Sequence, residues 1–254
     1  MLEQLFPNNV FALALVFARM GGAIMLLPGF GEVFVPRRVR LMIALAVTLV
    51  VAPLVTQSLP PTPAGPFGMI GQLGSELIIG IFLGSLARMM VAALHTAGVI
   101  AGFQTSLSNA QLFDPMTSDQ GSLLGSLLHV FGVFVIFAAD MHHLMIGALV
   151  QSYHLFVPGA ALPIGDLSAA AVRMLGQSFV LGMQIAAPFI VSGMLFYLGL
   201  GLLSRLMPQV QVFFIVVPIQ LALGFLVLAL TLSAGLMWFL GAFQTAFQGL
   251  FLSR

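Results

Sequence analysis

Long apolar runs dominate this sequence and limit what it can fold into. A helix needs about 20 mostly apolar residues to cross a hydrocarbon core of about 30 Å. Stretches of that quality are Val10–Leu27, Leu41–Val55, Met69–Ala101, Leu123–Val150, Val172–Leu203 and Val212–Leu240. Backbone polar groups in lipid must be satisfied internally, and the runs lack the short alternation of a membrane barrel. We therefore expect an all-α membrane protein with about six hydrophobic helical segments.

Composition excludes an ordinary soluble domain. Hydrophobic residues make up 60% of the chain and charged residues only 6%, whereas soluble domains carry about 25% charged residues. The net charge of +1 offers no basic face to nucleic acid. Cysteine is absent, which excludes disulfides and thiolate metal sites.

Several segments do not fit a simple span. Met69–Ala101 has about 33 residues, or about 50 Å as one straight helix, and Leu41–Val55 is slightly short. Glycine and proline recur inside the segments at Gly80, Gly84, Gly182, Pro188, Gly193 and Pro218. These features favour broken or tilted helices that pack on protein as much as on lipid.

Arginine placement predicts the orientation. Arg37, Arg38 and Arg40 follow the first segment, and Arg205 lies between the last two. With six crossings, both loops lie on the same side, which the positive-inside rule assigns to the cytoplasm, and the N-terminus lies outside. The chain begins without a basic signal region, so we expect the first segment to be a retained span.

Ionisable side chains interrupt the apolar segments. They are Arg19, Glu76, Arg88, His95, His129 and Asp140. A charge at the bilayer centre costs about 2.5–3.5 kcal/mol on insertion scales, so such residues face protein or water. Pairing between packed helices is the favoured interpretation. An ion path or proton relay built on Arg19, Glu76, Arg88 and Asp140 is the alternative.

No catalytic, cofactor or metal motif is recognisable in the sequence. Asp140, His142 and His143 invite a metal site, but adjacent histidines on a helix point about 100° apart. We therefore expect a structural or interfacial role for them and no bound metal. Gly80 and Gly84 form a small-xxx-small pair that lets another backbone approach closely.

The segment Gln104–Gly121 is polar and rich in turn-forming residues. Pro115 disfavours helix at Asp114, and Ser, Asn and Asp residues surround it. One interpretation is an exposed connecting loop. The other is a loop folded into a water-filled path, where Leu112, Phe113 and Met116 would form a hydrophobic gate.

Over nearly its whole length the sequence resembles the FliR family of flagellar biosynthesis proteins and the homologous T-type component of virulence type III secretion. The resemblance is carried, in order, by Pro28-Gly29-Phe30 to Pro36-Arg37, the Glu76 to Gly84 run, the Ala97 to Pro115 stretch, His143-Leu144, Pro158-Gly159, and Met207-Pro208-Gln209-Val210-Gln211-Val212-Phe213-Phe214 with Pro218 and Gly224. Family members often have glycine where Thr105 or Ser106 stands here.

The resemblance implies a single-copy, non-enzymatic subunit of a conical export gate without cofactors. Its partners would be the P-type and Q-type subunits, other membrane proteins of the export apparatus and unfolded flagellar proteins. Its location would be the bacterial inner membrane at the flagellar basal body. The family also implies that helical hairpins of the assembled complex rise out of the bilayer, so the six-crossing topology would describe the freshly inserted chain better.

The resemblance also divides the chain. Residues 1–171 would form a P-type-like part and residues 172–254 a Q-type-like hairpin. The tip of this hairpin would be Met207, Pro208 and Gln209. A plug loop would span residues 106–122, with Ser106, Leu112, Phe113, Asp114, Pro115 and Met116 in the closed pore and Phe113 nearest its centre.

Three other functions are weighed against the flagellar export gate. The first is a virulence export-gate subunit, which the sequence does not separate from a flagellar one. The second is a secondary transporter, which predicts matched inverted repeats that we do not find. An intramembrane enzyme would need a catalytic constellation that the sequence lacks.

Overall fold

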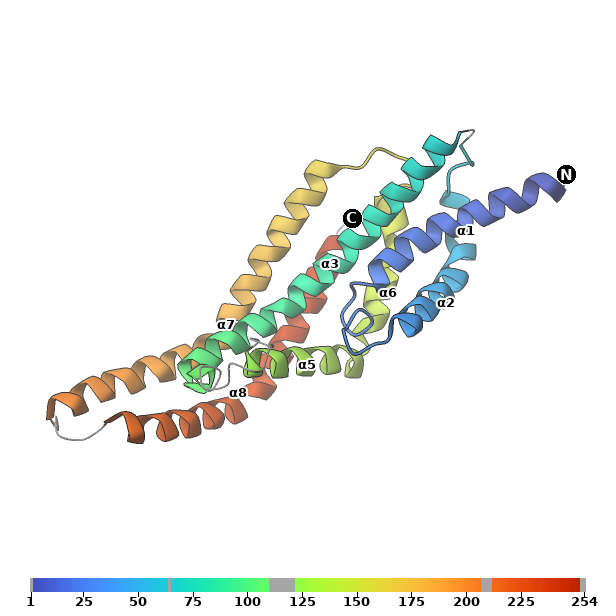
Figure 1. Cartoon of the computed structure of the whole chain (residues 1–254). Helices are drawn as coiled ribbons and strands as arrows, with labels where there is room; N and C mark the ends of the chain where they lie inside the picture. Colours follow the sequence, from blue (N-terminus) through green and yellow to red (C-terminus); the bar gives the residue numbers. More distant parts are fainter. Residues whose placement is uncertain (1, 64, 110–121, 207–211, 252–254) are drawn as a thin grey trace. The chain divides into compact units, whose positions relative to one another are not determined.

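A computed structural model of the chain describes residues 2–63, 65–109, 122–206 and 212–251. The regular secondary structure of these residues is helical, with no strand among them, which confirms the all-α class. The α-helices are α1 (Leu2–Ile24), α2 (Arg37–Val55), α3 (Pro66–Gln104), α5 (Leu123–Ala138), α6 (Met141–Leu155), α7 (Ile164–Leu206) and α8 (Val212–Phe251), as Figure 1 shows. Two 3-10 turns, Thr56–Ser58 and Leu107–Asn109, follow α2 and α3.

All six expected segments are present as helices, but fewer than six have the length and composition of a span. Among the described residues, four helices qualify, namely α2, α3, α7 and the Val216–Gly249 part of α8. The count is five if α5 and α6 form one broken span. The apolar part of α1, Val10–Ile24, is too short to count with them. The described residues thus hold four or five candidate spans, and the six-crossing topology and the orientation of the chain stay predictions.

One expected segment is broken where the sequence gives little warning. α5 ends at Ala138, α6 begins at Met141, and the two helices are bent by 77°. Asp140 lies at the break in the left-handed region, with φ 56° and ψ 19°. Aspartate tolerates this conformation better than most residues, which explains a turn without glycine or proline. In contrast, α7 and α8 continue through Pro188 and Pro218.

The chain divides into two compact units that interleave along the sequence. The first unit consists of residues 1–89, 136–175 and 244–254, and the second of residues 90–135 and 176–243. The expected division after residue 171 follows the family resemblance and stays a prediction.

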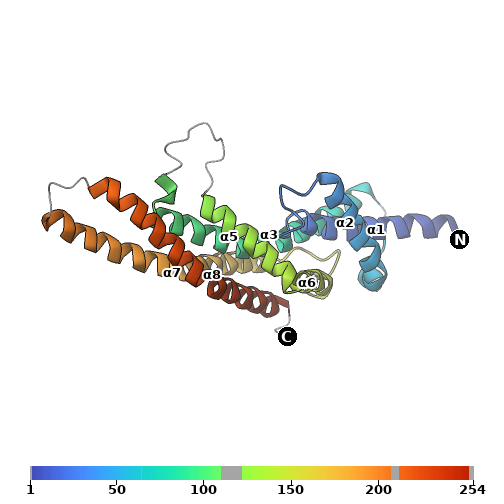
Figure 2. The same ribbon diagram turned by 90° about the horizontal axis from the view of Figure 1, so that it is seen from below.

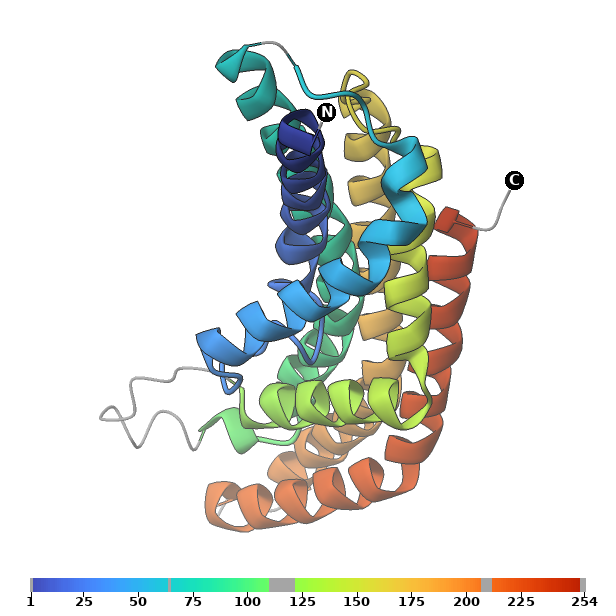
Figure 3. The ribbon, with the colours of Figure 1, turned by 90° about the vertical axis from the view of Figure 1, so that its right-hand side faces the viewer.

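In the first unit, α1 packs against α2 (Figure 3) and against the first part of α3. α1 and α3 come so close that their backbone atoms are in contact. A Cβ atom on Gly84 would lie 2.6 Å from the backbone oxygen of Ala23, and one on Gly22 would lie 3.1 Å from that of Leu77. A Cβ atom on Gly80 would overlap the backbone oxygen of Arg19. Gly80 and Gly84, the small-xxx-small pair of α3, thus allow α1 to pack directly against the α3 backbone.

In the second unit, the C-terminal part of α7 and the N-terminal part of α8 lie side by side (Figures 1 and 2). A buried cluster of Ala101, Leu124 and Phe189 joins α3, α5 and α7. A Cβ atom on Gly98 of α3 would lie 2.5 Å from the Cα atom of Gly125 of α5, so these helices also touch through their backbones. The close packing positions the end of α3 against the α7–α8 pair.

Candidate functional site

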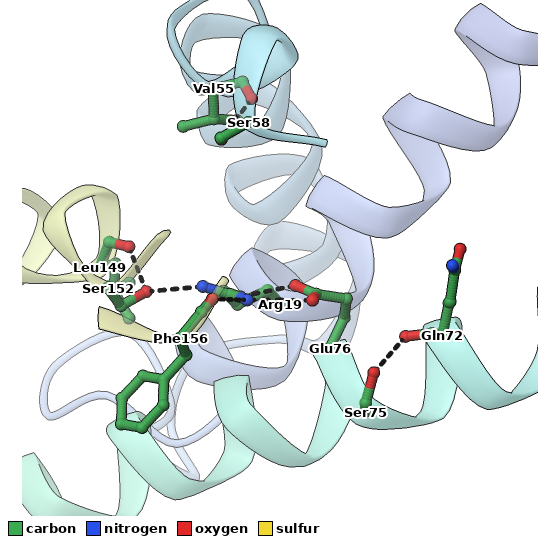
Figure 4. Close-up of polar contacts among 9 residues, drawn as sticks. All are labelled: Arg19, Val55, Ser58, Gln72, Ser75, Glu76, Leu149, Ser152 and Phe156. Carbon is green, nitrogen blue, oxygen red and sulfur yellow. Dashed lines mark hydrogen bonds and ion pairs between the residues drawn. The ribbon is translucent and has the colours of Figure 1, made fainter. Parts of the chain in front are cut away.

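Arg19 is the centre of a buried polar cluster in the first unit (Figure 4). Its Nε donates to Glu76 Oε2 at 2.6 Å and its Nη2 donates to Glu76 Oε1 at 2.9 Å. The Arg19 side chain is 0% exposed and that of Glu76 is 1% exposed. The two charges, which the sequence places on separate apolar helices, therefore form one bidentate ion pair.

α6 and the residue after it supply the remaining partners of the guanidinium. Nη1 donates to the Ser152 hydroxyl at 3.2 Å, and Nη2 donates to the Phe156 carbonyl at 2.8 Å. The Ser152 hydroxyl in turn donates to the Leu149 carbonyl at 2.6 Å. The guanidinium carbon lies 4.0 Å from the centroid of the Tyr153 ring. The cluster thus ties α1, α3 and α6 together in a setting that excludes water.

The backbone makes this arrangement possible. Glu76 and Gly80 lie one turn apart on α3 and therefore face the same side. The missing side chain at Gly80 lets the backbone of Arg19 touch α3, so the guanidinium reaches the carboxylate beside it. A buried pair of this kind contributes little net stability, but loss of one partner leaves an uncompensated buried charge.

The other two expected buried charges are exposed on the chain by itself, so their burial stays a prediction. Arg88 lies on an exposed face of α3, and Asp140 at the α5–α6 break is also exposed. Of the four charges that a transporter path would need, only two are enclosed, and those two satisfy each other. His95 and His129 are partly buried.

Asp140, His142 and His143 lie closer together than the helical argument allows. One potential ligand atom from each lies within 4.8 Å of the others, and the two imidazole centroids are 4.1 Å apart. The 100° argument concerns only His142 and His143 of α6, whereas Asp140 precedes α6 in a left-handed conformation. The His143 and Asp140 side chains are 74% and 78% exposed, whereas His142 is partly buried and its Nδ1 atom is buried without a hydrogen-bond partner.

Of the six residues named for the plug, Ser106 is the one that lies within the described residues. It is buried, with φ 57°, and its hydroxyl donates to Gln220 Oε1 of α8 at 2.6 Å. Leu112, Phe113, Asp114, Pro115 and Met116 lie outside the described residues. So do the expected hairpin-tip residues Met207, Pro208 and Gln209.

Sequence reasoning did not single out Ser152, Tyr153 or Gln220. Gln220 had a signal, because a lone amide stands inside the apolar stretch Val212–Leu240, where an unpaired polar side chain is costly. Ser152 and Tyr153 lie at the end of an apolar segment and give no comparable signal. Their role emerges only when α6 is placed beside Arg19.

Comparisons with known proteins find relatives that align with most of the chain. Residues 10–246 match the profile of the bacterial export proteins, family 1. The flagellar biosynthetic protein FliR of Caulobacter vibrioides is 41% identical over 225 residues, which cover 89% of this chain and 90% of that protein. FliR of Bacillus subtilis is 30% identical over 233 residues, 91% of this chain and 88% of that protein. The Yop proteins translocation protein T of Yersinia pestis is 28% identical over 193 residues, 74% of this chain and 72% of that protein.

Proposed function

The chain belongs to the bacterial export proteins, family 1, and from that premise we propose that it is a pore-forming subunit of the flagellar protein export gate. In this role it passes unfolded flagellar proteins across the inner membrane while the flagellum is built. The observation that carries the proposal is the similarity to a flagellar biosynthetic protein along about nine-tenths of both chains. The chain is a structural part of the pore, and its partners supply the energy.

The lengths of α7 and α8 support a place inside a protein assembly. With 43 and 40 residues, they are about 65 and 60 Å long, roughly twice the thickness of the hydrocarbon core. The most apolar windows of α7 and α8 are only 17% and 11% buried by the chain itself. Apolar surface that extends beyond lipid needs protein to cover it. The P-type and Q-type subunits of the gate are the partners that we propose for it.

The plug assignment is part of the proposal. Residues 106–122 would close the resting pore, with Phe113 near its centre, and would move aside during export. Its support is the sequence resemblance together with the apolar character of Leu112, Phe113 and Met116. The location that follows is the inner membrane at the flagellar basal body.

Gene deletion tests the flagellar role. In a motile host, loss of the gene is expected to abolish swimming and the export of flagellar proteins, and a plasmid copy is expected to restore both. Secretion of virulence effectors is expected to continue. Loss of effector secretion with normal swimming would instead assign the chain to a virulence system, the candidate favoured by its similarity to the Yersinia pestis protein.

Co-purification tests the assembly. After mild detergent extraction, the tagged chain is expected to bring down two other small hydrophobic proteins in a fixed ratio. Recovery of the chain alone or as a homodimer would contradict the proposal.

Deletion of residues 112–117 tests the plug assignment and is expected to make cells leak ions. A membrane that stays tight to ions, with normal export, would contradict the assignment.

A further inference from the structure

Three potential metal ligands lie close together where α6 begins in the first unit. One ligand atom from each of Asp140, His142 and His143 lies within 4.8 Å of the other two. The Asp140 Oδ1 and His143 Nδ1 atoms are 3.8 Å apart. The ligand atoms of a tetrahedral zinc ion lie about 3.4 Å from one another, for bonds of about 2.1 Å. Rotations of the two exposed side chains, Asp140 and His143, would therefore bring all three groups onto one ion.

The turn before α6 explains how residues so near in the sequence can share an ion. Within one helix, residues two positions apart point about 200° away from each other. Asp140 instead has a left-handed backbone, and its carbonyl accepts the N–H of His143 at 3.1 Å. Its carboxylate makes no hydrogen bond that caps the helix, the usual role of aspartate at this position. The carboxylate thus remains available to an ion.

The two histidines also approach each other, although they occupy adjacent helical positions. The ring centroids of His142 and His143 are only 4.1 Å apart. The angle of about 100° between successive residues describes the directions of the Cα–Cβ bonds. It leaves the side-chain rotations free, and here those rotations bring the rings together. Adjacent positions on α6 therefore do not prevent both imidazoles from binding the same ion.

Aromatic packing fixes the orientation of the His142 ring. This ring stacks on that of Phe137, with centroids 5.1 Å apart and an angle of 12° between the planes. The Phe137 ring in turn meets that of Phe30 edge-on, with centroids 5.3 Å apart. A ligand whose rotamer is fixed by its neighbours loses little freedom when an ion binds. His142 is therefore the fixed ligand, and Asp140 and His143 adjust to it.

His142 also has a buried nitrogen that needs a partner. Its Nδ1 atom is buried without a hydrogen bond. Buried polar atoms are nearly always paired, because an unpaired one costs free energy. A ring nitrogen that carries no proton accepts a hydrogen bond or binds a metal ion. A metal ion is thus a partner of the required kind, and the other two ligand groups already lie beside the ring.

We propose that Asp140, His142 and His143 bind one divalent transition-metal ion, of the class that zinc represents. Two imidazoles and one carboxylate form a known type of open zinc site, in which water completes the coordination. Magnesium and calcium prefer oxygen ligands, so the two imidazoles select against them. The bound ion joins the first turn of α6 to the residue before it. The inference goes beyond the export-gate function and does not depend on it.

Zinc binding to the purified full chain in detergent tests the proposal, with an affinity tag that contains no histidine. Calorimetric titration is expected to show one zinc ion bound per chain. Zinc is also expected to raise the midpoint of thermal unfolding, because it binds the folded chain. Magnesium at the same concentration is expected to do neither. A chain that takes up no zinc, or that responds equally to magnesium, would overturn the proposal.

Variants of the three ligands locate the ion. Asp140→Asn keeps the size of the side chain and its tolerance of the left-handed backbone, and His143→Ala changes an exposed side chain. Each of them, like His142→Ala, is expected to weaken zinc binding more than about tenfold, since even the loss of an outer partner of a ligand costs about that much. The control is His154→Ala, which removes an exposed histidine from the last turn of α6 and is expected to bind zinc as wild type does.

The pattern of losses separates this site from zinc held elsewhere on the chain. If His142→Ala does not fold, because the stack on Phe137 is lost, the two exposed positions decide. Weaker binding in both Asp140→Asn and His143→Ala supports the proposal. Unchanged binding in either of them would mean an adventitious ion only, and the proposal would be wrong. Gene deletion tests the export-gate function separately, so that function stands or falls independently of the metal site.

Discussion

Arg19 and Glu76 stand 57 residues apart in the sequence and meet through two hydrogen bonds that no water reaches. They link α1 to α3, and the remaining Nη bonds of Arg19 link both helices to Ser152 and Phe156. Arg19 and Glu76 thus serve to orient helices of the first unit. This relationship gives the first two predictions.

Glu76→Gln is expected to lower the free energy of unfolding by about 3–5 kcal/mol, because it leaves the Arg19 charge buried and uncompensated. The double variant Arg19→Met with Glu76→Leu is expected to lose much less, since it removes both charges and keeps the volume. Thermal unfolding of the purified proteins in detergent compares them. A double variant as unstable as the single one would show that the ion pair contributes more than its desolvation costs.

Tyr153→Phe is expected to be neutral within about 0.5 kcal/mol. The Tyr153 hydroxyl is buried without a hydrogen-bond partner, while the ring that faces the Arg19 guanidinium remains. Tyr153→Leu is expected to lower stability, because it removes the aromatic face. Equal losses from both changes would assign the effect to the hydroxyl rather than to the ring.

Gly80→Ala is expected to lower the free energy of unfolding by about 1–3 kcal/mol, because the new methyl group overlaps the Arg19 backbone and forces α1 away from α3. Gly74→Ala on the same helix is the control, since a Cβ atom there would meet nothing within 4 Å. That change is expected to stabilise α3 by about 0.5–1 kcal/mol through helix propensity. Thermal unfolding in detergent measures both variants, and similar shifts would contradict the close approach of α1.

Gly29→Ala is expected to be destabilising by about 1 kcal/mol or more. Gly29 has φ 83°, and a Cβ atom there would overlap the ring of Phe137. Gly147→Ala on α6, with no atom within 4 Å of its Cβ position, is expected to be tolerated. The yield of folded protein after detergent extraction tests the pair. Equal yields would indicate that the turn at Gly29 has no fixed conformation.

The sequence predicts the helices of this protein better than their ends and partners. Apolar length predicts α3, α7 and α8 because backbone groups in lipid have only the helix to satisfy them. It overestimates the effect of Pro188 and Pro218, where the helices continue, and misses the break at Asp140, where local hydrogen bonding and αL tolerance act without glycine or proline.

The sequence predicts which charged residues of the candidate site need partners, but it does not predict which residues pair with one another. Arg19 and Glu76 were expected to seek partners because isolated buried charges are costly. Which charges pair is a property of tertiary packing, and Arg88, on an exposed face of the same helix as Glu76, carries the same sequence signal. Ser106 was expected within a plug loop, but its tie to Gln220, 114 residues away, depends on how α8 lies beside the end of α3.

The length of α7 affects how stable the chain is against degradation before it is assembled with its partners. Of its roughly 65 Å, the hydrocarbon core covers about 30 Å, and exposed side chains such as Phe179, Leu198 and Leu206 are spread along its length. In a newly made chain without partners, apolar side chains at one or both ends of α7 are therefore exposed to water. Membrane proteases recognise such surfaces, so the half-life of the orphan chain is expected to be short and to lengthen when its partners are co-expressed. Degradation of unassembled copies would then keep the number of this subunit matched to the number of gates.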